Sequence, residues 1–360
     1  MRYLSTGIFL LGSAVVLSSQ LAPPAATEGR AAALVGTPRK VERSKPPESS
    51  VEQLKAQYRR PDAIPFPKEN PYTTEKAALG KKLYFDTRLS AANVLSCASC
   101  HSPGYAWGDG LPKGVGHGMK ELGRRSPTIV NAAFGQIFMW DGRAGSLEEQ
   151  ALGPIQADVE MNMPLDRLMA RLNTIPEYKP WFDAAFPKEG MKPATIAMAI
   201  ATYERTVVSG LAPFDQWIQG NEKAISEEAK RGFVLFNGKA QCASCHSGWN
   251  FTDDSFHDIG LKDGDIGRGK QMPQVIKMQY AFKTPGLREI ARRGPYMHDG
   301  AMATLEAVVE HYDHAGVSRP SRSDLIKPLA LSAQEKADLV AFMKTLTSDI
   351  DPTTVPVLPR

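Results

Sequence analysis

The residues best suited to chemistry in this chain are two identical hexapeptides, Cys-Ala-Ser-Cys-His-Ser, at residues 97–102 and 242–247. Each contains Cys-x-x-Cys-His, the spacing at which a haem is attached covalently. Two thiols separated by two residues can bond to the two vinyl groups of one porphyrin, and the adjacent imidazole can then bind the iron. The motifs therefore predict two c-type haems, with His101 and His246 as proximal iron ligands. They use all four cysteines of the chain: Cys97, Cys100, Cys242 and Cys245.

Two other kinds of site use cysteine pairs at this spacing. A zinc site could combine both pairs, but zinc does not require a histidine directly after the second cysteine of each pair. A thioredoxin-like redox dithiol needs only one pair. The repeated histidine therefore favours haem over both alternatives.

The amino terminus predicts export. Met1 and Arg2 form a short positive start, an apolar run follows at residues 8–17, and small residues cluster near residue 25. The run is too short to span a bilayer, so residues 1–26 are interpreted as a signal peptide rather than a retained anchor. Export agrees with haem attachment, which takes place outside the cytoplasm. We expect a periplasmic protein whose mature form has no membrane span.

Composition bounds the remaining chain. With 360 residues, 42% hydrophobic and 23% charged, it is long enough for two globular domains. The net charge of +4 is small. A nucleic-acid-binding protein would show a concentrated basic face, so this charge argues against a nucleic-acid partner. Residues 27–65 are rich in Pro, Ser, Lys and Arg and predict a flexible linker. Residues 351–360 contain three prolines and predict a tail.

The elements that must position the two motifs are predicted to be helices and loops, giving a mainly α fold with little β structure. Residues 73–85 carry Leu79 and Leu83 on one helical face, and residues 193–208 contain few helix breakers. A capping box at residues 332–335 predicts the start of another helix. Two cytochrome c-like haem domains are expected, an N-terminal domain at residues 66–215 and a C-terminal domain at residues 216–350. Matching segments before the two motifs, residues 79–85 and 230–236, indicate a diverged duplication.

Ordered matches around both motifs make the chain resemble the bacterial dihaem cytochrome c peroxidases and their MauG-type relatives. The resemblance runs from about residue 71 to residue 346 and implies a haem-dependent peroxidase. The matching segments are Leu83-Tyr-Phe-Asp-Thr-Arg-Leu-Ser90, Ser126-Pro-Thr-Ile-Val-Asn131, Trp140-Asp-Gly-Arg143, Gly153-Pro-Ile-Gln156, Phe282-Lys-Thr-Pro285, Pro295-Tyr-Met-His-Asp-Gly300 and Ala303-Thr-Leu-Glu306.

The resemblance implies that peroxide reacts at the first haem, on the face opposite His101. Cleavage of the O–O bond needs a base that moves a proton from one oxygen to the other. Glu160 matches the distal glutamate of the family and Gln150 its distal glutamine. Trp140 matches the tryptophan between the two haems, where it would relay electrons. Without the resemblance, Glu160 would be interpreted as a solvated loop acid, Gln150 as a surface amide and Trp140 as core packing.

His117, in Gly116-His-Gly118, matches a histidine that many family members use as a removable sixth ligand of the first haem. In those enzymes reduction of the other haem moves the loop and opens the site. The neighbouring glycines would permit such movement. An exposed loop histidine without function is the alternative.

The second haem departs from the peroxidase pattern. Its distal methionine is replaced by Tyr312, as in MauG-type members, and residues 305–313 form a predicted helix that turns this side chain inwards. A phenol oxygen stabilises higher oxidation states of iron than a thioether does. The alternatives are a plain core tyrosine, or ligation by His311, His314 or Met302.

Two further departures concern calcium and the exit of electrons. The asparagine that binds calcium in the family is Arg125 here, and the matching backbone oxygens belong to Arg293 and Pro295. A guanidinium cannot bind calcium, so we expect calcium to be absent and its charge to be replaced by Arg125. MauG has a tryptophan six residues before the second proximal histidine, and this chain has Ala240 at that position. Electrons would therefore leave by another route.

Together these features predict an exported dihaem peroxidase. It would reduce hydrogen peroxide at the N-terminal haem, with electrons passed through the C-terminal haem from a protein donor such as a small cytochrome or a cupredoxin. One alternative is a MauG- or MbnH-like enzyme that uses peroxide to oxidise Trp or Tyr side chains of a specific partner protein. The other is a non-catalytic dihaem electron carrier.

Overall fold

Helices and long loops make up the part of the chain that the computed structural model describes, residues 48–349 and 353–359. The prediction of a mainly α fold with little β structure is confirmed, because the described residues hold one two-stranded sheet of two residues per strand. No helix among them is long and apolar enough to cross a membrane. The α-helices and strands are α1 (Glu48–Gln57), α2 (Thr74–Phe85), α3 (Cys97–Cys100), α4 (Leu147–Gln156), α5 (Leu165–Leu172), α6 (Tyr178–Ala185), α7 (Pro193–Thr206), α8 (Pro213–Ile218), α9 (Glu227–Asn237), β1 (Phe256–His257), β2 (Phe282–Lys283), α10 (Leu305–His314) and α11 (Ala333–Lys344).

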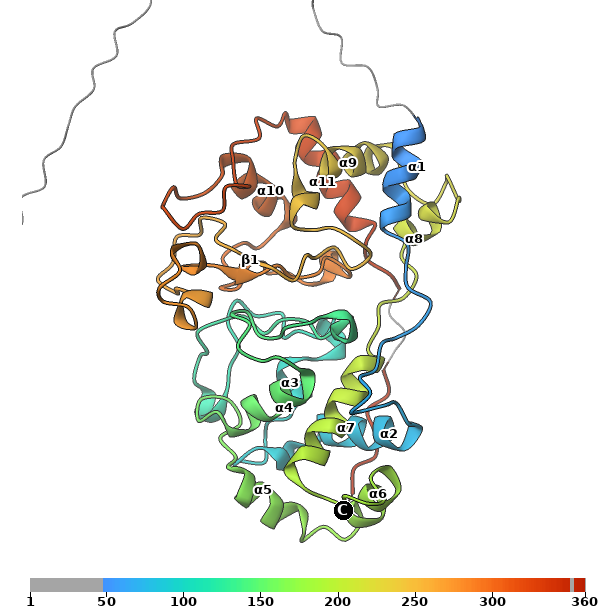
Figure 1. Cartoon of the computed structure of the whole chain (residues 1–360), viewed down its shortest axis with the longest axis vertical. Helices are drawn as coiled ribbons and strands as arrows, with labels where there is room; N and C mark the ends of the chain where they lie inside the picture. Colours follow the sequence, from blue (N-terminus) through green and yellow to red (C-terminus); the bar gives the residue numbers. More distant parts are fainter. Residues whose placement is uncertain (1–47, 350–352, 360) are drawn as a thin grey trace, which may run out of the picture. The chain divides into compact units, whose positions relative to one another are not determined.

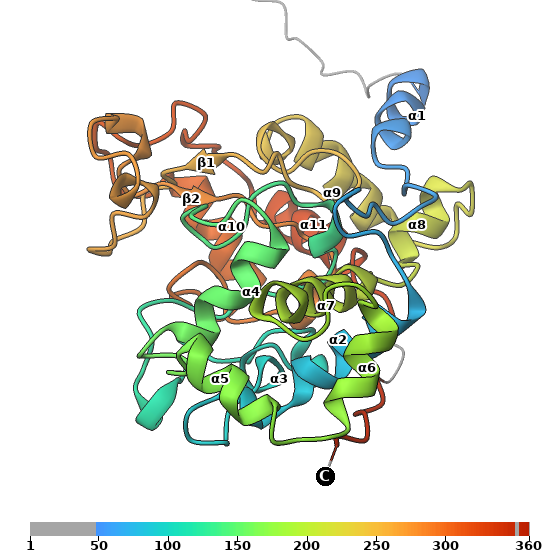
Figure 2. The same cartoon turned by 60° about the horizontal axis from the view of Figure 1, so that its bottom comes forward.

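The first half of the chain is built on α2 and α7, which lie side by side (Figures 1 and 2). The Thr73 side chain caps α2 by accepting a hydrogen bond from the backbone N–H of Lys76. Leu79 and Leu83 are buried on one face, as their spacing predicted. Gly80 lets the two helices approach closely, since a Cβ there would lie 1.9 Å from the carbonyl oxygen of Ala199.

The second half repeats this arrangement with α9 and α11 (Figure 1). Ser332 and Glu335 form the predicted capping box at the start of α11. Gly232 of α9 takes the place of Gly80, because a Cβ there would lie 2.0 Å from the carbonyl oxygen of Asp338. In each half, the helix before the Cys-x-x-Cys-His motif, α2 or α9, therefore packs closely against a later helix, α7 or α11, which agrees with a duplication.

Each half has its own hydrophobic core, and these cores place the boundaries differently from the sequence. Phe214 and Trp217 of α8 are buried in the second core, so the boundary predicted at residue 215 falls inside a helix of the C-terminal half. The flexible linker predicted for residues 27–65 contains α1, and Tyr58 is buried against Phe251 at 4.8 Å between ring centroids. Its average composition hid the helical spacing of Val51, Leu54 and Tyr58.

The two chain ends agree only in part with the sequence analysis. The predicted signal peptide, residues 1–26, lies outside the described residues. The predicted tail is in contact with the first half, because Lys81 donates a hydrogen bond to the Thr354 side chain and Lys82 to the carbonyl oxygen of Val357.

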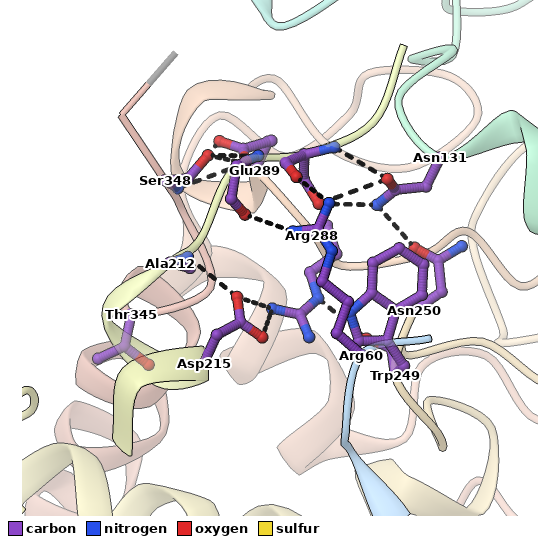
Figure 3. Close-up of polar contacts among 12 residues, drawn as sticks. Arg60, Asn131, Ala212, Asp215, Trp249, Asn250, Arg288, Glu289, Thr345 and Ser348 are labelled. Carbon is purple, nitrogen blue, oxygen red and sulfur yellow. Dashed lines mark hydrogen bonds and ion pairs between the residues drawn. The ribbon is translucent and has the colours of Figure 1, made fainter. Parts of the chain in front are cut away.

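A buried polar network joins segments from both halves (Figure 3). Asn131 accepts a hydrogen bond from the backbone N–H of Ser209 and donates one to the Asn250 side chain. Within the C-terminal half, Arg288 pairs with Asp215 at 2.9 Å and donates to the carbonyl oxygen of Trp249, so it fixes the loop that follows the second motif.

Candidate haem sites

The first motif opens into a cavity, called the first cavity. Cys97 and Cys100, on α3, lie in its wall with His101. His101 Nδ1 lies 2.7 Å from the carbonyl oxygen of Pro127, which leaves Nε2 free for a metal. Burial lowers the pKa of His101 and favours the neutral imidazole that binds iron.

Glu160 and Gln150 both line the first cavity. Gln150 projects from α4, and Glu160 lies in the loop after that helix. Burial raises the pKa of the Glu160 carboxyl, against the opposing effect of the nearby Arg143 guanidinium. A carboxyl group that holds its proton more tightly than usual is suited to proton transfer near neutral pH.

His117 lies beside Glu160 but is not part of the wall of the first cavity. Its backbone N–H donates to the carbonyl oxygens of Val159, at 3.1 Å, and Glu160, at 2.8 Å. Its Nδ1 is buried and has no hydrogen-bond partner among the described residues. Gly116 is packed tightly, because a Cβ there would lie 1.9 Å from the Val159 carbonyl oxygen. This glycine therefore serves close packing in the structure, in addition to any loop movement.

The second motif opens into another cavity, called the second cavity. His246 lies in its wall with both cysteines of its motif, and its Nδ1 lies 2.9 Å from the carbonyl oxygen of Phe251. Tyr312, on α10, lines the same cavity. The alternative ligands His311, His314 and Met302 do not line it. His311 and His314 instead lie 2.9 Å from the Ile259 carbonyl oxygen and 2.7 Å from Glu310, respectively.

Arg125 and Trp140 are the residues common to the walls of both cavities. The Trp140 indole N–H donates to the carbonyl oxygen of Arg125 at 2.8 Å. The backbone N–H of Arg125 donates to the carbonyl oxygen of His298 at 2.7 Å. The Trp140 ring also lies edge-on to the His298 ring at 6.3 Å between centroids. An aromatic side chain is thus held between the two cavities, where Trp140 was predicted.

Comparisons with known proteins agree with this geometry. Residues 74–223 match the family model described as di-haem cytochrome c peroxidase, and residues 229–347 match cytochrome c. The chain is 54% identical to the methylamine utilization protein MauG of Methylorubrum extorquens over 309 residues, covering 85% of this chain and 88% of that protein. The chain belongs to the di-haem cytochrome c peroxidase family.

Two other members of the family show its breadth. The cytochrome c551 peroxidase of Pseudomonas aeruginosa is 35% identical over 311 residues, covering 83% of this chain and 86% of that protein. The crystal structure of a MauG-like protein associated with microbial copper homeostasis is 34% identical, with a TM-score of 0.74 over 81% of this chain and 95% of that one.

As a family member, the chain is a haem-dependent oxidoreductase with two c-type haems. The residues fit these cofactors. Each cavity offers the histidine of its motif, whose Nδ1 faces a carbonyl oxygen and whose Nε2 is free, and two cysteines that form no disulfide. Because the two cysteine pairs line different cavities, they do not form the single zinc site considered as an alternative.

Two titratable residues that the sequence analysis did not assign also line the cavities. Glu204, on α7, lines the first cavity, is 4% exposed and has one carboxylate oxygen without a partner; burial raises its pKa to about 8. His257, on β1, lines the second cavity, and its Nε2 lies 2.8 Å from the Asp253 carboxylate. The hydrogen bond to Asp253 is the largest contribution that raises the pKa of His257 to about 10. No local sequence pattern marks either residue, because only packing brings them to the cavities.

Proposed function

We propose that this protein is a MauG-like enzyme, which reduces hydrogen peroxide at the first haem and uses the oxidising equivalents on Trp or Tyr side chains of a partner protein. The observation that carries the proposal is Tyr312, which lines the second cavity, whereas the alternative distal ligands His311, His314 and Met302 do not. The 54% identity to the Methylorubrum extorquens MauG supports the same branch of the family.

Haem iron would supply the binding and redox activation of peroxide; His101 and His246 would hold the two irons, and Tyr312 would also bind the second. The chain contributes proton transfer in the first cavity. There the Glu160 carboxyl takes a proton from one peroxide oxygen and delivers it to the leaving oxygen, while the Gln150 amide orients the substrate. Reduction of one peroxide to two waters consumes two protons and two electrons, and the partner protein supplies those electrons.

Trp140 provides the connection between the two sites in this proposal. Its ring lies in the wall of both cavities, and its hydrogen bond to Arg125 fixes its orientation. Trp140 would carry electrons between the two haem sites, because it is a wall residue of both cavities. Ala240 is buried in the wall of the second cavity, so a tryptophan exit at that position is absent and the partner docks elsewhere.

The second candidate function is that of a cytochrome c peroxidase, in which a small cytochrome or a cupredoxin donates the electrons. His117 favours it, because its backbone is bound to the Glu160 loop and its Nδ1 is buried without a described partner. A movement of this loop would carry His117 to the first haem as a removable ligand. In both candidates the protein is exported to the periplasm by a signal peptide at residues 1–26.

Spectroscopy of the fully oxidised protein, before and after one equivalent of peroxide, separates the candidates. We expect an immediate absorbance change without prior reduction. A protein that reacts only after one haem has been reduced would be a cytochrome c peroxidase with His117 as the closing ligand. A protein that ignores peroxide in both states would be an electron carrier, and the proposal would be wrong.

The variant Tyr312→Phe tests the second haem separately. Removal of the phenol oxygen should convert the spectrum of this haem from six-coordinate to five-coordinate. The matched control is His311→Phe on the same helix, which should leave the spectrum unchanged. An unaltered spectrum in the tyrosine variant would remove Tyr312 from the ligand set.

A further inference from the structure

Two arginine side chains are buried beside the haem cavities without an acidic partner. Arg125 is 5% exposed and Arg293 is 6% exposed. Neither forms a salt bridge with a carboxylate among the described residues, and the Nε atom of each is buried without a hydrogen-bond partner. Buried charges in proteins are normally paired, so two such groups require a counter-charge.

The Arg125 guanidinium is also held against the backbone of Arg293. Arg125 Nη2 donates a hydrogen bond of 2.6 Å to the carbonyl oxygen of Arg293. Arg293 Nη1 donates to the carbonyl oxygens of Gly286 and Arg288 at 2.7 and 2.9 Å. Backbone oxygens orient both groups but do not neutralise them, and the two like charges repel each other.

The positions of Arg125 and Arg293 in the cavity walls indicate which anions can bind them. Arg125 lies in the wall of both cavities, and Arg293 lies in the wall of the second. A c-type haem is bonded through its vinyl groups, so it keeps both of its propionate carboxylates. Guanidinium groups bind carboxylates through paired, charge-assisted hydrogen bonds.

We propose that Arg125 and Arg293 form a binding site for haem propionates, in which Arg125 serves both haems and Arg293 serves the second. This site compensates the buried charge of the two arginines and of the carboxylates together. It also positions Trp140, because the backbone of Arg125 accepts the indole hydrogen bond and donates to His298. The proposal depends on the two haems but not on the peroxide chemistry proposed above.

Midpoint potentials of the two haems, measured by spectroelectrochemistry without peroxide, test this site. A nearby positive charge stabilises the reduced haem, which carries one positive charge fewer than the oxidised haem. We expect Arg125→Gln to lower both potentials and Arg293→Gln to lower mainly that of the second haem. Arg125→Lys keeps the positive charge, so its two midpoint potentials should stay closer to those of the wild type.

Arg292→Gln is the matched control, because Arg292 is exposed and adjacent to Arg293 in the chain. It should move neither potential. Unchanged potentials in Arg125→Gln and Arg293→Gln, at full covalent haem content, would overturn the proposal. If Arg125→Gln does not fold, the comparison of Arg293→Gln with Arg292→Gln decides, and equal potentials in that pair would again overturn it.

Elemental analysis gives an independent readout. The Arg293 carbonyl oxygen, one of the expected calcium ligands, already accepts the Arg125 hydrogen bond. We therefore expect purified wild-type protein to contain no stoichiometric calcium. Stoichiometric calcium whose removal by a chelator shifts the potentials would assign the compensating charge to the metal instead of Arg125. Because no peroxide is used, these results are independent of whether the enzyme turns over.

Discussion

At the scale of single residues, the first cavity combines side chains that reach it from different elements. Gln150 comes from α4, Glu160 from the loop after that helix and Glu204 from α7. Glu204 is buried and Glu160 is half-buried beside the same space, and burial raises the pKa of each. We expect Glu160 to meet peroxide, and Glu204, which has an unpartnered oxygen, to affect stability.

Replacement of the Glu160 carboxyl should remove proton transfer while leaving the haems in place. Glu160→Gln is expected to lower the rate of peroxide reduction by about 10²- to 10⁴-fold, the usual contribution of a general acid–base group. The rate is measured by stopped-flow absorbance. Asp158→Asn, an exposed acid two residues earlier, is the control and should retain the wild-type rate. A rate in Glu160→Gln within a few fold of the wild type would contradict the assignment.

Glu204 should make stability depend on pH. Its pKa is 4.5 in the reference state and about 8 in the folded protein, so between these values the folded protein binds more protons than the unfolded chain. The free energy of unfolding therefore falls as pH rises through this range, by up to about 1.4 kcal/mol per pH unit. In Glu204→Gln this contribution should disappear.

Urea unfolding of the haem-loaded wild type and Glu204→Gln at pH 5, 6.5 and 8, chosen to span roughly the titration range, measures the effect. The difference in stability between the two proteins should grow with pH in favour of the variant. A difference that stays constant across the range would show that Glu204 titrates normally.

At the scale of elements, the close helix pair of each half, α2 with α7 and α9 with α11, depends on a glycine at the contact. Alanine has a higher helix propensity than glycine by about 1 kcal/mol. At Gly232, however, the added Cβ would lie 2.0 Å from the backbone carbonyl oxygen of Asp338, which cannot rotate away. The helices would have to separate, and overpacking of this kind costs about 3 kcal/mol.

Gly232→Ala should therefore lower the melting temperature despite its better helix propensity, and Gly80→Ala should do the same in the first half. Gly264→Ala is the control, because nothing lies within 4 Å of its Cβ position. It should be neutral or slightly stabilising. Calorimetry measures all three variants, and a wild-type melting temperature for Gly232→Ala would mean that the helices can shift without loss.

At the scale of the whole molecule, polar side chains connect two separate hydrophobic cores. Arg124 binds Asp141 of the first half at 2.9 Å and Asp265 of the second half at 2.6 Å. This guanidinium holds the pKa of both carboxyl groups below their usual range against the opposing effect of burial. It therefore stabilises the contact beside Trp140 as long as both acids are ionised.

Arg124→Met should lower the free energy of unfolding by about 3 kcal/mol at pH 7, the lower end of the range for a broken buried pair, since Arg124 is partly exposed. Depressed acid pKa values contribute stability that is present above the unfolded-state pKa near 4 and is lost as pH falls. The difference between wild type and variant should therefore shrink below about pH 4. Urea unfolding at pH 7 and pH 3 checks both statements, and an equal difference at the two values would contradict the linkage.

The sequence by itself determined the cofactors and the helical fold. Cys-x-x-Cys-His is a local pattern whose chemistry depends on residues within one turn, so His101 and His246 needed no tertiary information. The capping box at Ser332 is equally local, and the helix after it begins where predicted. The family resemblance added Glu160, Gln150, Trp140 and Tyr312, and the structure brings each of these to a cavity wall. Their functions stay predictions.

Only the tertiary structure decided which side chains share a space. Residues 48–58 looked like linker because their composition was averaged with a polar segment, yet Tyr58 packs in the second core. Glu204 and His257 carry no local signal, and long-range packing places them at the cavities. The pairing of Arg125 with the Arg293 carbonyl joins residues 168 positions apart. Burial and charge compensation depend on such distant contacts, which a linear pattern does not contain.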